Sequence, residues 1–267
     1  MEKGKLIGQG RTSEVFEWGA DKVLKLFRSD FPKIAIENEY KTSLNINVHL
    51  NLTPKVYKIV EIDDRTGIIY QRVNGITMME KVAFKPWSVK SEAKKLAELH
   101  ESIQQKVDFT IPNNKIKLKD NISETDLVED KKNKLYEYID KLADGNVLCH
   151  GDFHPDNIIL TKDKPVIIDW MTATRGNPGA DIARTSIMFK YGVIPEKTYI
   201  EVKIINFIRK KFYLEYLKHY TSISNVKIEE VQQWELPIAA ARLNERIPEN
   251  EKLALFNFIS TKIEKIK

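Results

Sequence analysis

The sequence predicts an α+β protein with two lobes: a small antiparallel sheet carrying one helix, and a larger, mainly helical lobe. Short runs of β-branched and aromatic residues between turn signals fill the first part of the chain, whereas apolar residues at helical spacing dominate the rest. The pattern changes after Asn74-Gly75, so we place the lobes at 1–74 and 75–267. A chain of 267 residues, 42% hydrophobic, is long enough for one large core or two modest ones.

The first lobe is expected to contain five strands and one helix. The strands cover 5–7, 13–16, 22–27, 56–62 and 68–71. Between the third and fourth strands, Asp30 can cap a helix that has Pro32 in its first turn and apolar residues at helical spacing as far as Leu44. The segment Asp-Asp-Arg-Thr-Gly at 63–67 has the chemistry of a hairpin turn.

The second lobe is expected to be helical around a central strand, loop and strand. The two short strands cover 147–149 and 158–160. Helices are expected briefly after Thr77, over 88–105, from Ser123 to Leu142, and over most of the chain from Asp181 onward. The polar segment 107–121 is interpreted as a surface connection. Three prolines are expected to mark helix starts or breaks: Pro195, Pro237 and Pro248.

Composition limits the partners and the compartment. The net charge of +5 comes from 43 basic and 38 acidic residues interspersed along the predicted helices, as on solvated helix faces, so we expect no nucleic-acid partner. No apolar stretch reaches the roughly 20 residues that cross a bilayer, and no signal-peptide core follows the N-terminus. The single cysteine, Cys149, excludes an internal disulfide. We expect a cytoplasmic monomer or weak homodimer.

The run His-Gly-Asp-Phe-His-Pro-Asp-Asn at 150–157, followed by Ile-Ile-Asp-Trp at 167–170, indicates a phosphoryl-transfer centre. Asp152 stands where a base can take the proton of a substrate hydroxyl. Asn157 and Asp169 offer hard oxygen ligands of the kind that Mg²⁺ prefers, and the metal in turn holds nucleotide phosphates.

This stretch resembles the aminoglycoside phosphotransferase and choline kinase superfamily, small-molecule kinases that share the protein-kinase fold. The family pattern, His-Gly-Asp-x-His-x-x-Asn with a later hydrophobic-Ile-Asp, is matched by His150, Gly151, Asp152, His154, Asn157, Ile168 and Asp169. The resemblance extends from Gly8 to about Ala183. It implies a bilobal protein-kinase-like fold that uses ATP, or GTP, with Mg²⁺ to phosphorylate a hydroxyl of a small molecule.

The segment from Ile7 to Phe16 resembles the glycine-rich loop of such kinases. Gly8 and Gly10 lack side chains, so backbone N–H groups can approach phosphate oxygens. Ser13 stands where protein kinases have a third glycine, and a serine in this loop is common in the antibiotic-kinase branch. A tight hairpin without a ligand is the alternative interpretation.

Lys25 lies in an otherwise apolar strand, at the distance from the glycine loop expected for the lysine that contacts the α- and β-phosphates. A solvated, outward-facing lysine is the alternative. An acidic partner is expected on the following helix, and we favour Glu39, with Glu37 as the alternate. The two are separated by about 200° on a helical wheel, so only one can face inward.

The run from Ile68 to Gly75 resembles the edge strand and hinge between kinase lobes. The resemblance implies that the carbonyl of Gln71 and the backbone N–H of Val73 hydrogen-bond adenine, with Tyr70 behind the base.

The central loop has a second possible interpretation. Its two histidines and three carboxylates also suit a zinc or two-metal hydrolase site, but His49, His100 and His219 have no neighbours that would complete one. In the resembling family His150 and His154 hold the loop by hydrogen bonds. Asp181 matches a family aspartate that can cap the next helix and brace the catalytic loop.

The acceptor is left open by the sequence. Trp234, Glu235, Arg242 and Glu245 lie on a late predicted helix, where they form either an acceptor pocket or a solvated charged face. Converging carboxylates would suit a polycationic aminoglycoside and aromatic side chains a choline-like amine, while a sugar or thiamine is equally open. An inert nucleotide-binding scaffold and a protein kinase are the rivals, and the short segment 172–181 speaks against the latter.

Overall fold

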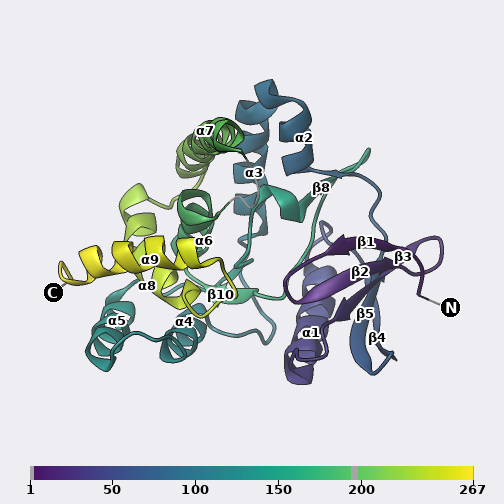
Figure 1. Cartoon of the computed structure of the whole chain (residues 1–267), viewed down its shortest axis with the longest axis horizontal. Helices are drawn as coiled ribbons and strands as arrows, with labels where there is room; N and C mark the ends of the chain where they lie inside the picture. Colours follow the sequence, from purple (N-terminus) through teal and green to yellow (C-terminus); the bar gives the residue numbers. More distant parts are fainter. Residues whose placement is uncertain (1–2, 194–197, 267) are drawn as a thin grey trace. The chain divides into compact units, whose positions relative to one another are not determined.

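The computed structural model describes residues 3–193 and 198–266 (Figure 1). The chain forms two compact units, the first running up to Glu80 and continuing from Pro155 to Thr172. The second contains Lys81–His154 and the chain from Ala173 onward. An antiparallel sheet with one helix lies in the first unit and most helices lie in the second, so the predicted α+β class is confirmed. The lobe boundary at residue 74 stays a prediction.

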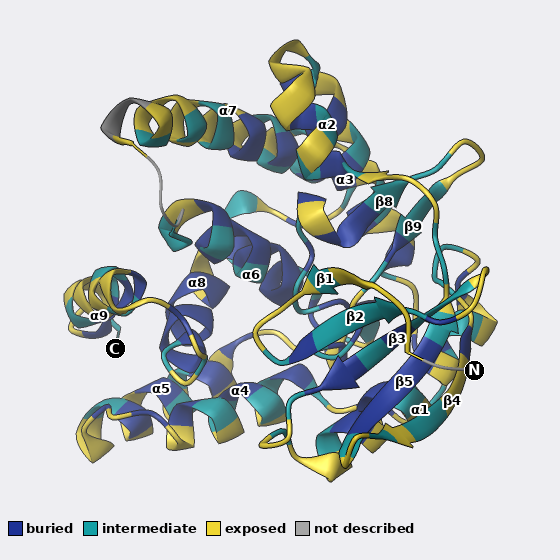
Figure 2. Ribbon diagram, turned by 45° about the vertical axis from the view of Figure 1, so that its right-hand side comes forward, coloured by how far each residue is buried: buried dark blue, intermediate teal, exposed yellow. Residues whose placement is uncertain are grey.

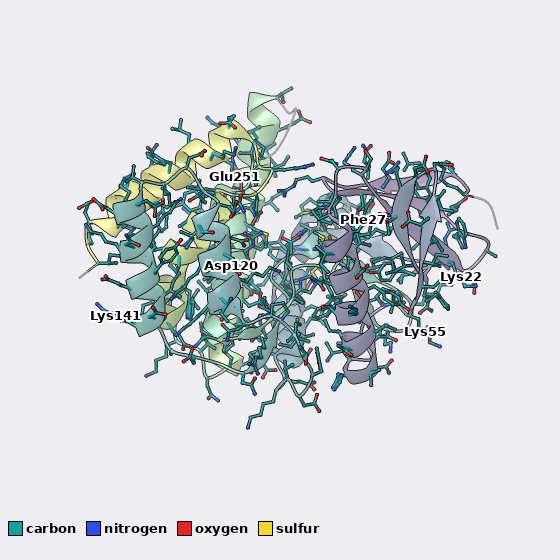
Figure 3. All side chains as sticks on the ribbon, turned by 90° about the horizontal axis from the view of Figure 1, so that it is seen from below. Lys22, Phe27, Lys55, Asp120, Lys141 and Glu251 are labelled. Carbon is teal, nitrogen blue, oxygen red and sulfur yellow. The ribbon has the colours of Figure 1, made fainter. Side chains whose placement is uncertain are left out.

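The first unit is built on a five-stranded antiparallel sheet, the number of strands that the sequence predicts. Its strands are β1 (Leu6–Gln9), β2 (Ser13–Glu17), β3 (Lys22–Phe27), β4 (Val56–Ile62) and β5 (Arg65–Gln71), in the order β1-β2-β3-β5-β4. Helix α1 (Lys33–His49) packs on β4 and β5. Phe27 and Ile36 are buried between sheet and helix with Ile68, and Figure 3 labels Phe27 in this core.

Two local predictions of the first unit have different outcomes. The expected hairpin turn is present: Asp63 and Asp64 have φ of 51° and 58°, the left-handed conformation that a two-residue turn between β4 and β5 requires. The expected cap of α1 is wrong. Pro32 occupies the N-cap position and no side-chain hydrogen bond caps the helix, so Asp30 does not have that role.

A second, three-stranded sheet completes the first unit. It consists of β6 (Ile76–Thr77), β8 (Ile158–Leu160) and β9 (Pro165–Ile167), in the order β6-β8-β9. A single 3₁₀ turn, Pro155–Asn157, leads directly into β8. The predicted strand at 158–160 is therefore present, and it places Asn157 at the start of a hairpin.

The second unit is mainly helical. Its elements are η1 (Pro86–Ser88), α3 (Val89–Ile103), α4 (Asn114–Ser123), α5 (Glu129–Lys141), β7 (Val147–Cys149), β10 (Thr174–Gly176), α6 (Pro178–Tyr191), α7 (Tyr199–Ile223), α8 (Ile228–Arg242) and α9 (Glu249–Ile263). Helix α2 (Met78–Phe84) begins in the first unit and ends in the second. Helices α6 and α8 pack together and are the most deeply buried, as the dark ribbon in Figure 2 shows. The predicted strand at 147–149 is β7, which pairs with β10.

The segment around residue 115 corrects two predictions. Helix α4 occupies part of the expected surface connection, because the side chain of Asn113 accepts hydrogen bonds from the backbone N–H groups of Lys115 and Ile116 and caps the helix. The helix expected from Ser123 begins only at Glu129. Ser123 instead ends α4.

The three late prolines differ in their outcome. Pro248 is the N-cap residue of α9, as predicted, whereas Pro195 lies outside the described residues. Pro237 lies inside α8 without ending it. The proline cannot donate to the carbonyl of Gln233 one turn earlier, and that carbonyl accepts a hydrogen bond of 3.1 Å from the hydroxyl of Tyr138 instead. No helix in the part of the chain that the structure describes is long and apolar enough to cross a membrane.

Candidate active site

A cavity of about 730 Å³ lies in the first unit. Its lining includes all nine residues predicted to bind nucleotide or metal: Gly8, Gly10, Ser13, Lys25, Glu39, Gln71, Val73, Asn157 and Asp169. They come from β1, β2, β3, α1, β5 and the β8–β9 hairpin with its flanking residues. A cavity of this size matches those that hold small ligands.

The glycine turn at one edge of the cavity is closed by its own backbone and by an arginine. The N–H of Gly10 donates to the carbonyl of Ser13 at 2.8 Å. The guanidinium of Arg28 donates to the carbonyls of Gly10 at 3.2 Å and Arg11 at 2.9 Å. Arg28, which follows β3, therefore fixes the turn, and sequence reasoning did not identify it.

The fold itself does not require either glycine. A Cβ built on Gly8 would lie 3.6 Å from Val15, and one on Gly10 would lie 3.6 Å from the carbonyl oxygen of Ser13, both ordinary van der Waals contacts. Neither glycine has a positive φ. Neither packing nor backbone conformation therefore explains the two glycines, and the absence of Cβ atoms is what a turn needs where a phosphate approaches backbone N–H groups.

Lys25 connects two carboxylates of the cavity. Its Nζ donates to Glu39 Oε1 at 2.8 Å and to Asp169 Oδ1 at 2.9 Å. The structure therefore brings Lys25 to Glu39 of the two candidate partners on α1. Burial alone would lower the pKa of Lys25, but the charges of Asp169 and Glu39 raise it well above its usual range, so the ammonium remains charged.

Glu39 is held by more than the lysine. Only 3% of its surface is exposed, and burial raises the pKa of its carboxyl, against the opposing charge of Lys25. The hydroxyl of Tyr70 donates to Glu39 Oε1 at 2.9 Å and lies 3.3 Å from the hydroxyl of Ser43. Tyr70 thus fixes the carboxylate, and Ser43 contacts the Tyr70 hydroxyl, roles that the sequence did not reveal.

Asn157 and Asp169 stand at the same end of the β8–β9 hairpin. The backbone N–H of Ile168 donates to the carbonyl of Asn157 at 3.0 Å, so the two side chains start from neighbouring points of the backbone. Asp169 has φ of 63°, a left-handed conformation that aspartate tolerates better than most residues. One amide and one carboxylate oxygen group, both lining the cavity beside Lys25, fit the requirements of Mg²⁺.

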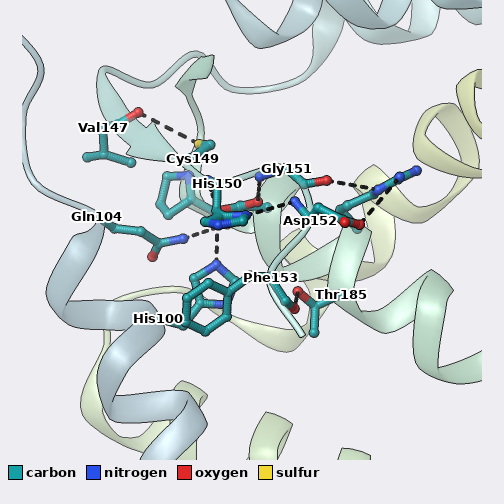
Figure 4. Close-up of polar contacts among 12 residues, drawn as sticks. His100, Gln104, Val147, Cys149, His150, Gly151, Asp152, Phe153 and Thr185 are labelled. Atoms are coloured by element: carbon teal, nitrogen blue, oxygen red, sulfur yellow. Dashed lines mark hydrogen bonds and ion pairs between the residues drawn. The ribbon is translucent and has the colours of Figure 1, made fainter. Parts of the chain in front are cut away.

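The loop that carries Asp152 lies in the second unit and is braced by Asp181. Asp181 accepts hydrogen bonds from the backbone N–H groups of His150 at 2.7 Å and Gly151 at 2.8 Å (Figure 4). Its Oδ2 also lies 2.9 Å from Nε2 of the buried His100. The bracing role predicted for Asp181 agrees with this geometry, whereas the cap of α6 is Asn177.

Two further residues of α6 hold the same loop. Arg184 Nε donates to the carbonyl of Gly151 at 3.0 Å, and the hydroxyl of Thr185 donates to the carbonyl of Phe153 at 2.8 Å. Asp181, Arg184 and Thr185 are spaced i, i+3 and i+4, so one face of the helix presents all three. Sequence reasoning missed Arg184 and Thr185, although this spacing after the family aspartate was visible.

The surroundings of Asp152 favour its ionised form. Burial would raise the pKa of the carboxyl, but the hydrogen bond and charge of His154 and the charge of Arg184 lower it well below its usual range. His154 Nε2 lies 3.4 Å from Asp152 Oδ2. The backbone N–H of Asp152 donates to His150 Nδ1 at 3.2 Å, which requires that nitrogen to be unprotonated.

The residues proposed to line an acceptor pocket have separate surroundings. Trp234 is buried in the core with 1% of its surface exposed, and Glu235 pairs with Lys190 of α6. Arg242 and Glu245 pair with each other at 2.9 Å. They do not form one solvated face, and each of these carboxylates has a cationic partner.

The zinc-site interpretation of the central loop has no structural support. Among residues 3–193 and 198–266, no group of three or more His, Cys, Asp or Glu side chains is placed to hold a metal ion.

Comparison with known proteins identifies the family. The fold and the cavity define a kinase-like protein, and residues 3–202 match the model of the phosphotransferase enzyme family, APH. The chain belongs to this family, so the resemblance found in the sequence is confirmed. A search of curated protein sequences found no match.

Solved structures of several small-molecule kinases have the same fold. A streptomycin–ATP complex of APH(2")-IIa is 16% identical, with 98% of this chain and 93% of that one covered and a TM-score of 0.59. An aminoglycoside-3'-phosphotransferase of type VIII is 14% identical, with 90% and 93% covered and a TM-score of 0.63. A putative fructosamine-3-kinase from Haemophilus somnus is 14% identical, with 97% and 91% covered and a TM-score of 0.56. The predicted protein-kinase-like fold is thereby confirmed.

Proposed function

We propose that this protein transfers the γ-phosphoryl group of ATP, or of GTP, to a hydroxyl of a small molecule in the cytoplasm, with Mg²⁺. The observation that carries the proposal is the cavity of the first unit, which gathers the glycine turn, the lysine and the two oxygen-bearing residues of the predicted motif. Membership of the phosphotransferase enzyme family supports the same conclusion.

The nucleotide phosphates would be bound by charge and by backbone donors. Lys25, with 13% of its side chain exposed, supplies an ammonium that stays charged, and the turn at Gly8 and Gly10 supplies backbone without Cβ atoms. Asn157 and Asp169 would hold Mg²⁺, which neutralises phosphate charge when bound. Since the transition state of phosphoryl transfer is loose, positioning and charge neutralisation supply most of the rate, and no covalent intermediate is needed.

Asp152 would act on the acceptor. A carboxylate whose pKa is depressed is a weak base in the ground state, so its first task is to accept a hydrogen bond from the acceptor hydroxyl and orient its oxygen. It takes the proton only as the new oxygen–phosphorus bond forms and the hydroxyl becomes acidic. Asp181 and the α6 face keep the loop in the required conformation.

Two rival functions predict different results. A catalytically inert scaffold would bind nucleotide without turnover on any acceptor, although degenerate kinases usually lose at least one of Lys25, Asp152, Asn157 and Asp169, and all four are present. A protein kinase would phosphorylate proteins and no small molecule. The short segment at 172–181 gives little room for phosphorylation-dependent control.

The acceptor is best sought by experiment. One similar structure contains streptomycin with ATP and another is a putative fructosamine-3-kinase, so aminoglycosides and ketoamines are the first two classes to test. Choline, thiamine and sugars such as methylthioribose complete the panel.

The decisive test is an acceptor screen with coupled detection of ADP, run in parallel on the wild-type chain and on Asp152→Asn. A true acceptor raises ADP production above the slow background hydrolysis in the wild type and not in the variant. Mass spectrometry of the product then shows an added phosphate on the acceptor. Nucleotide binding with no product from any class would favour the scaffold, and phosphate found only in added protein would favour the protein kinase.

A further inference from the structure

Arg184 contacts both the loop of Asp152 and Glu245, which follows helix α8. It lies on α6 with 12% of its side chain exposed, and its guanidinium has three separate contacts. Nε donates to the carbonyl of Gly151, Nη2 lies 3.9 Å from Asp152 Oδ1, and Nη1 lies 2.5 Å from Glu245 Oε1. Figure 4 shows dashed contacts that reach both Gly151 and Asp152. The guanidinium thus contacts the Gly151 carbonyl of the loop through Nε and the Glu245 carboxylate through Nη1.

The contacts continue beyond Glu245 as a row of alternating charges. Arg242 Nη1 lies 2.9 Å from Glu245 Oε2, and its Nε donates to Glu251 Oε1 at 2.7 Å. Glu251 Oε2 accepts a hydrogen bond of 3.3 Å from the backbone N–H of Val193, just after α6. The row therefore joins the loop of Asp152 to α6, α8 and α9.

The distances separate two effects of Arg184. The bond to Gly151 is a normal hydrogen bond, and it fixes the backbone immediately before Asp152. The 3.9 Å separation from the carboxylate is too long for a hydrogen bond, so Arg184 acts on Asp152 itself through its charge. Arginine suits this arrangement because its planar group offers donors in fixed directions, which a lysine cannot do.

We infer that Arg184 is a positioning residue for phosphoryl transfer: it orients Asp152 through the Gly151 carbonyl and through its charge, and Glu245 holds its guanidinium in place. The catalytic importance of Asp152 rests on the proposed function, but the effect of Arg184 on Asp152 does not. Other charged or titratable groups contribute to this neighbourhood: His150, His154, Lys117 of α4, Asp181, Arg242 and Glu251.

Three variants separate charge from geometry. Arg184→Lys keeps the positive charge and loses the planar guanidinium with its donors in fixed directions. Arg184→Met loses both and leaves the half-buried Glu245 with Arg242 as its cationic partner. The double variant Arg184→Met/Glu245→Gln restores the charge balance if the single variant unfolds. Lys190→Met is the matched control, because Lys190 also lies on α6 and pairs with a buried carboxylate, Glu235, away from the loop. Circular dichroism checks folding in each case.

The first measurement needs no acceptor. Carbon-detected NMR of the full chain with labelled aspartate carboxyls follows the titration of Asp152, assigned by the signal missing in Asp152→Asn. Removal of the Arg184 charge is expected to raise the pKa of Asp152, while Arg184→Lys and Lys190→Met leave it nearly unchanged. If the pKa of Asp152 were unchanged in both Arg184→Met and Arg184→Met/Glu245→Gln while both variants are folded, the inference would be overturned. This holds for any acceptor that the chain phosphorylates.

The second measurement uses slow hydrolysis of Mg–ATP, or transfer to an acceptor once one is known. We expect kcat to fall by up to about 100-fold in both Arg184→Lys and the double variant, with nucleotide affinity by calorimetry unchanged. Lys190→Met should keep the wild-type kcat. Full kcat in Arg184→Lys would show that orientation through Gly151 is not needed. A shifted Asp152 titration without any transfer activity would sustain the inference and reject the proposed function.

Discussion

The two charged clusters of this protein are built in opposite ways. In the first unit, one cation, Lys25, is shared by two carboxylates, Glu39 and Asp169. In the second unit, one carboxylate, Asp152, lies among cationic or titratable groups, which include His154 at 3.4 Å and Arg184 at 3.9 Å. Carboxylates are in excess in the first cluster and positive groups surround the carboxylate in the second.

The difference indicates what each cluster is prepared for. An excess of carboxylate oxygens beside a cavity can accept a further cation, which agrees with a divalent ion arriving with a nucleotide. A carboxylate surrounded by positive groups stays ionised without any ligand, so it is ready to accept a hydrogen bond from a neutral hydroxyl.

The largest expected effect is on catalysis, and it distinguishes Asp152 from Asp169. Asp152→Asn should lower kcat by about 10²–10⁴-fold, the range for a group that moves a proton in the transition state. Nucleotide affinity should be nearly intact, because the residues lining the proposed nucleotide cavity belong to the first unit. Asp169→Ala should instead weaken binding of Mg–nucleotide itself. Steady-state kinetics and calorimetry measure both, and equal, mild effects of the two changes would remove the distinction.

The next effect is on stability. Lys25→Met leaves Glu39 buried at 3% exposure without its cation, so we expect a loss of about 3–5 kcal/mol in the free energy of unfolding. Lys25→Met/Glu39→Gln removes the uncompensated charge and should recover much of the loss. Urea denaturation measures both. If the double variant were as unstable as the single one, the pair would not be the cause.

The stability contributed by Asp152 and the stability contributed by Glu39 should change in opposite directions as the pH falls. The pKa of Asp152 lies below its ordinary 3.8 in the folded chain, so its stabilising contribution is present above pH 3.8 and is lost as pH falls through the folded pKa. The pKa of Glu39 is raised above its ordinary 4.5, so the stability linked to it is present below pH 4.5 and is lost as pH rises through the folded pKa.

The measurement is the difference in unfolding free energy between the wild type and each neutral variant as a function of pH. The wild type should lose its advantage over Asp152→Asn on acidification and gain relative to Glu39→Gln. Slopes of the same sign would mean that the two carboxyls do not have contrasting surroundings.

The smallest effect concerns the glycine turn. Gly10→Ala adds a methyl group that meets the Ser13 carbonyl only at 3.6 Å, so the midpoint of thermal unfolding should change little. If phosphates approach this turn, the KM for nucleotide should rise several-fold with kcat and the Asp152 titration unaffected. Ser13→Ala is a useful companion, since it changes the neighbouring side chain and not the backbone. An unchanged KM would favour the tight-hairpin interpretation.

Much of the fold could be predicted because its signals are local. The five strands and the strands around the central loop follow from short apolar runs and turn residues. The helix α4 was missed because Asn113, its cap, lies in a polar segment that also looks like a loop. Pro237 was misinterpreted because the hydroxyl that satisfies the freed carbonyl, Tyr138, lies on another helix.

The candidate site also has a part that local sequence signals predict and a part that they do not. Asp152, Asn157 and Asp169 lie in one short stretch of the sequence, whereas several groups that contact the site come from distant parts of the chain. Arg184 contacts Glu245, and Tyr70 contacts Glu39, across 61 and 31 residues respectively. Such pairs depend on the tertiary packing of helices and strands, for which a single sequence has no pattern.

The only thiol of the chain, that of Cys149, directly precedes the loop of Asp152. Cys149 is 2% exposed, its Sγ lies 3.6 Å from the carbonyl of Asn177, and burial raises its pKa. A thiol reagent can therefore reach it only after a local opening of the structure around β7. The wild-type chain thus contains its own probe of local opening: labelling rates in the native and unfolded states give the free energy of that opening without an engineered tag.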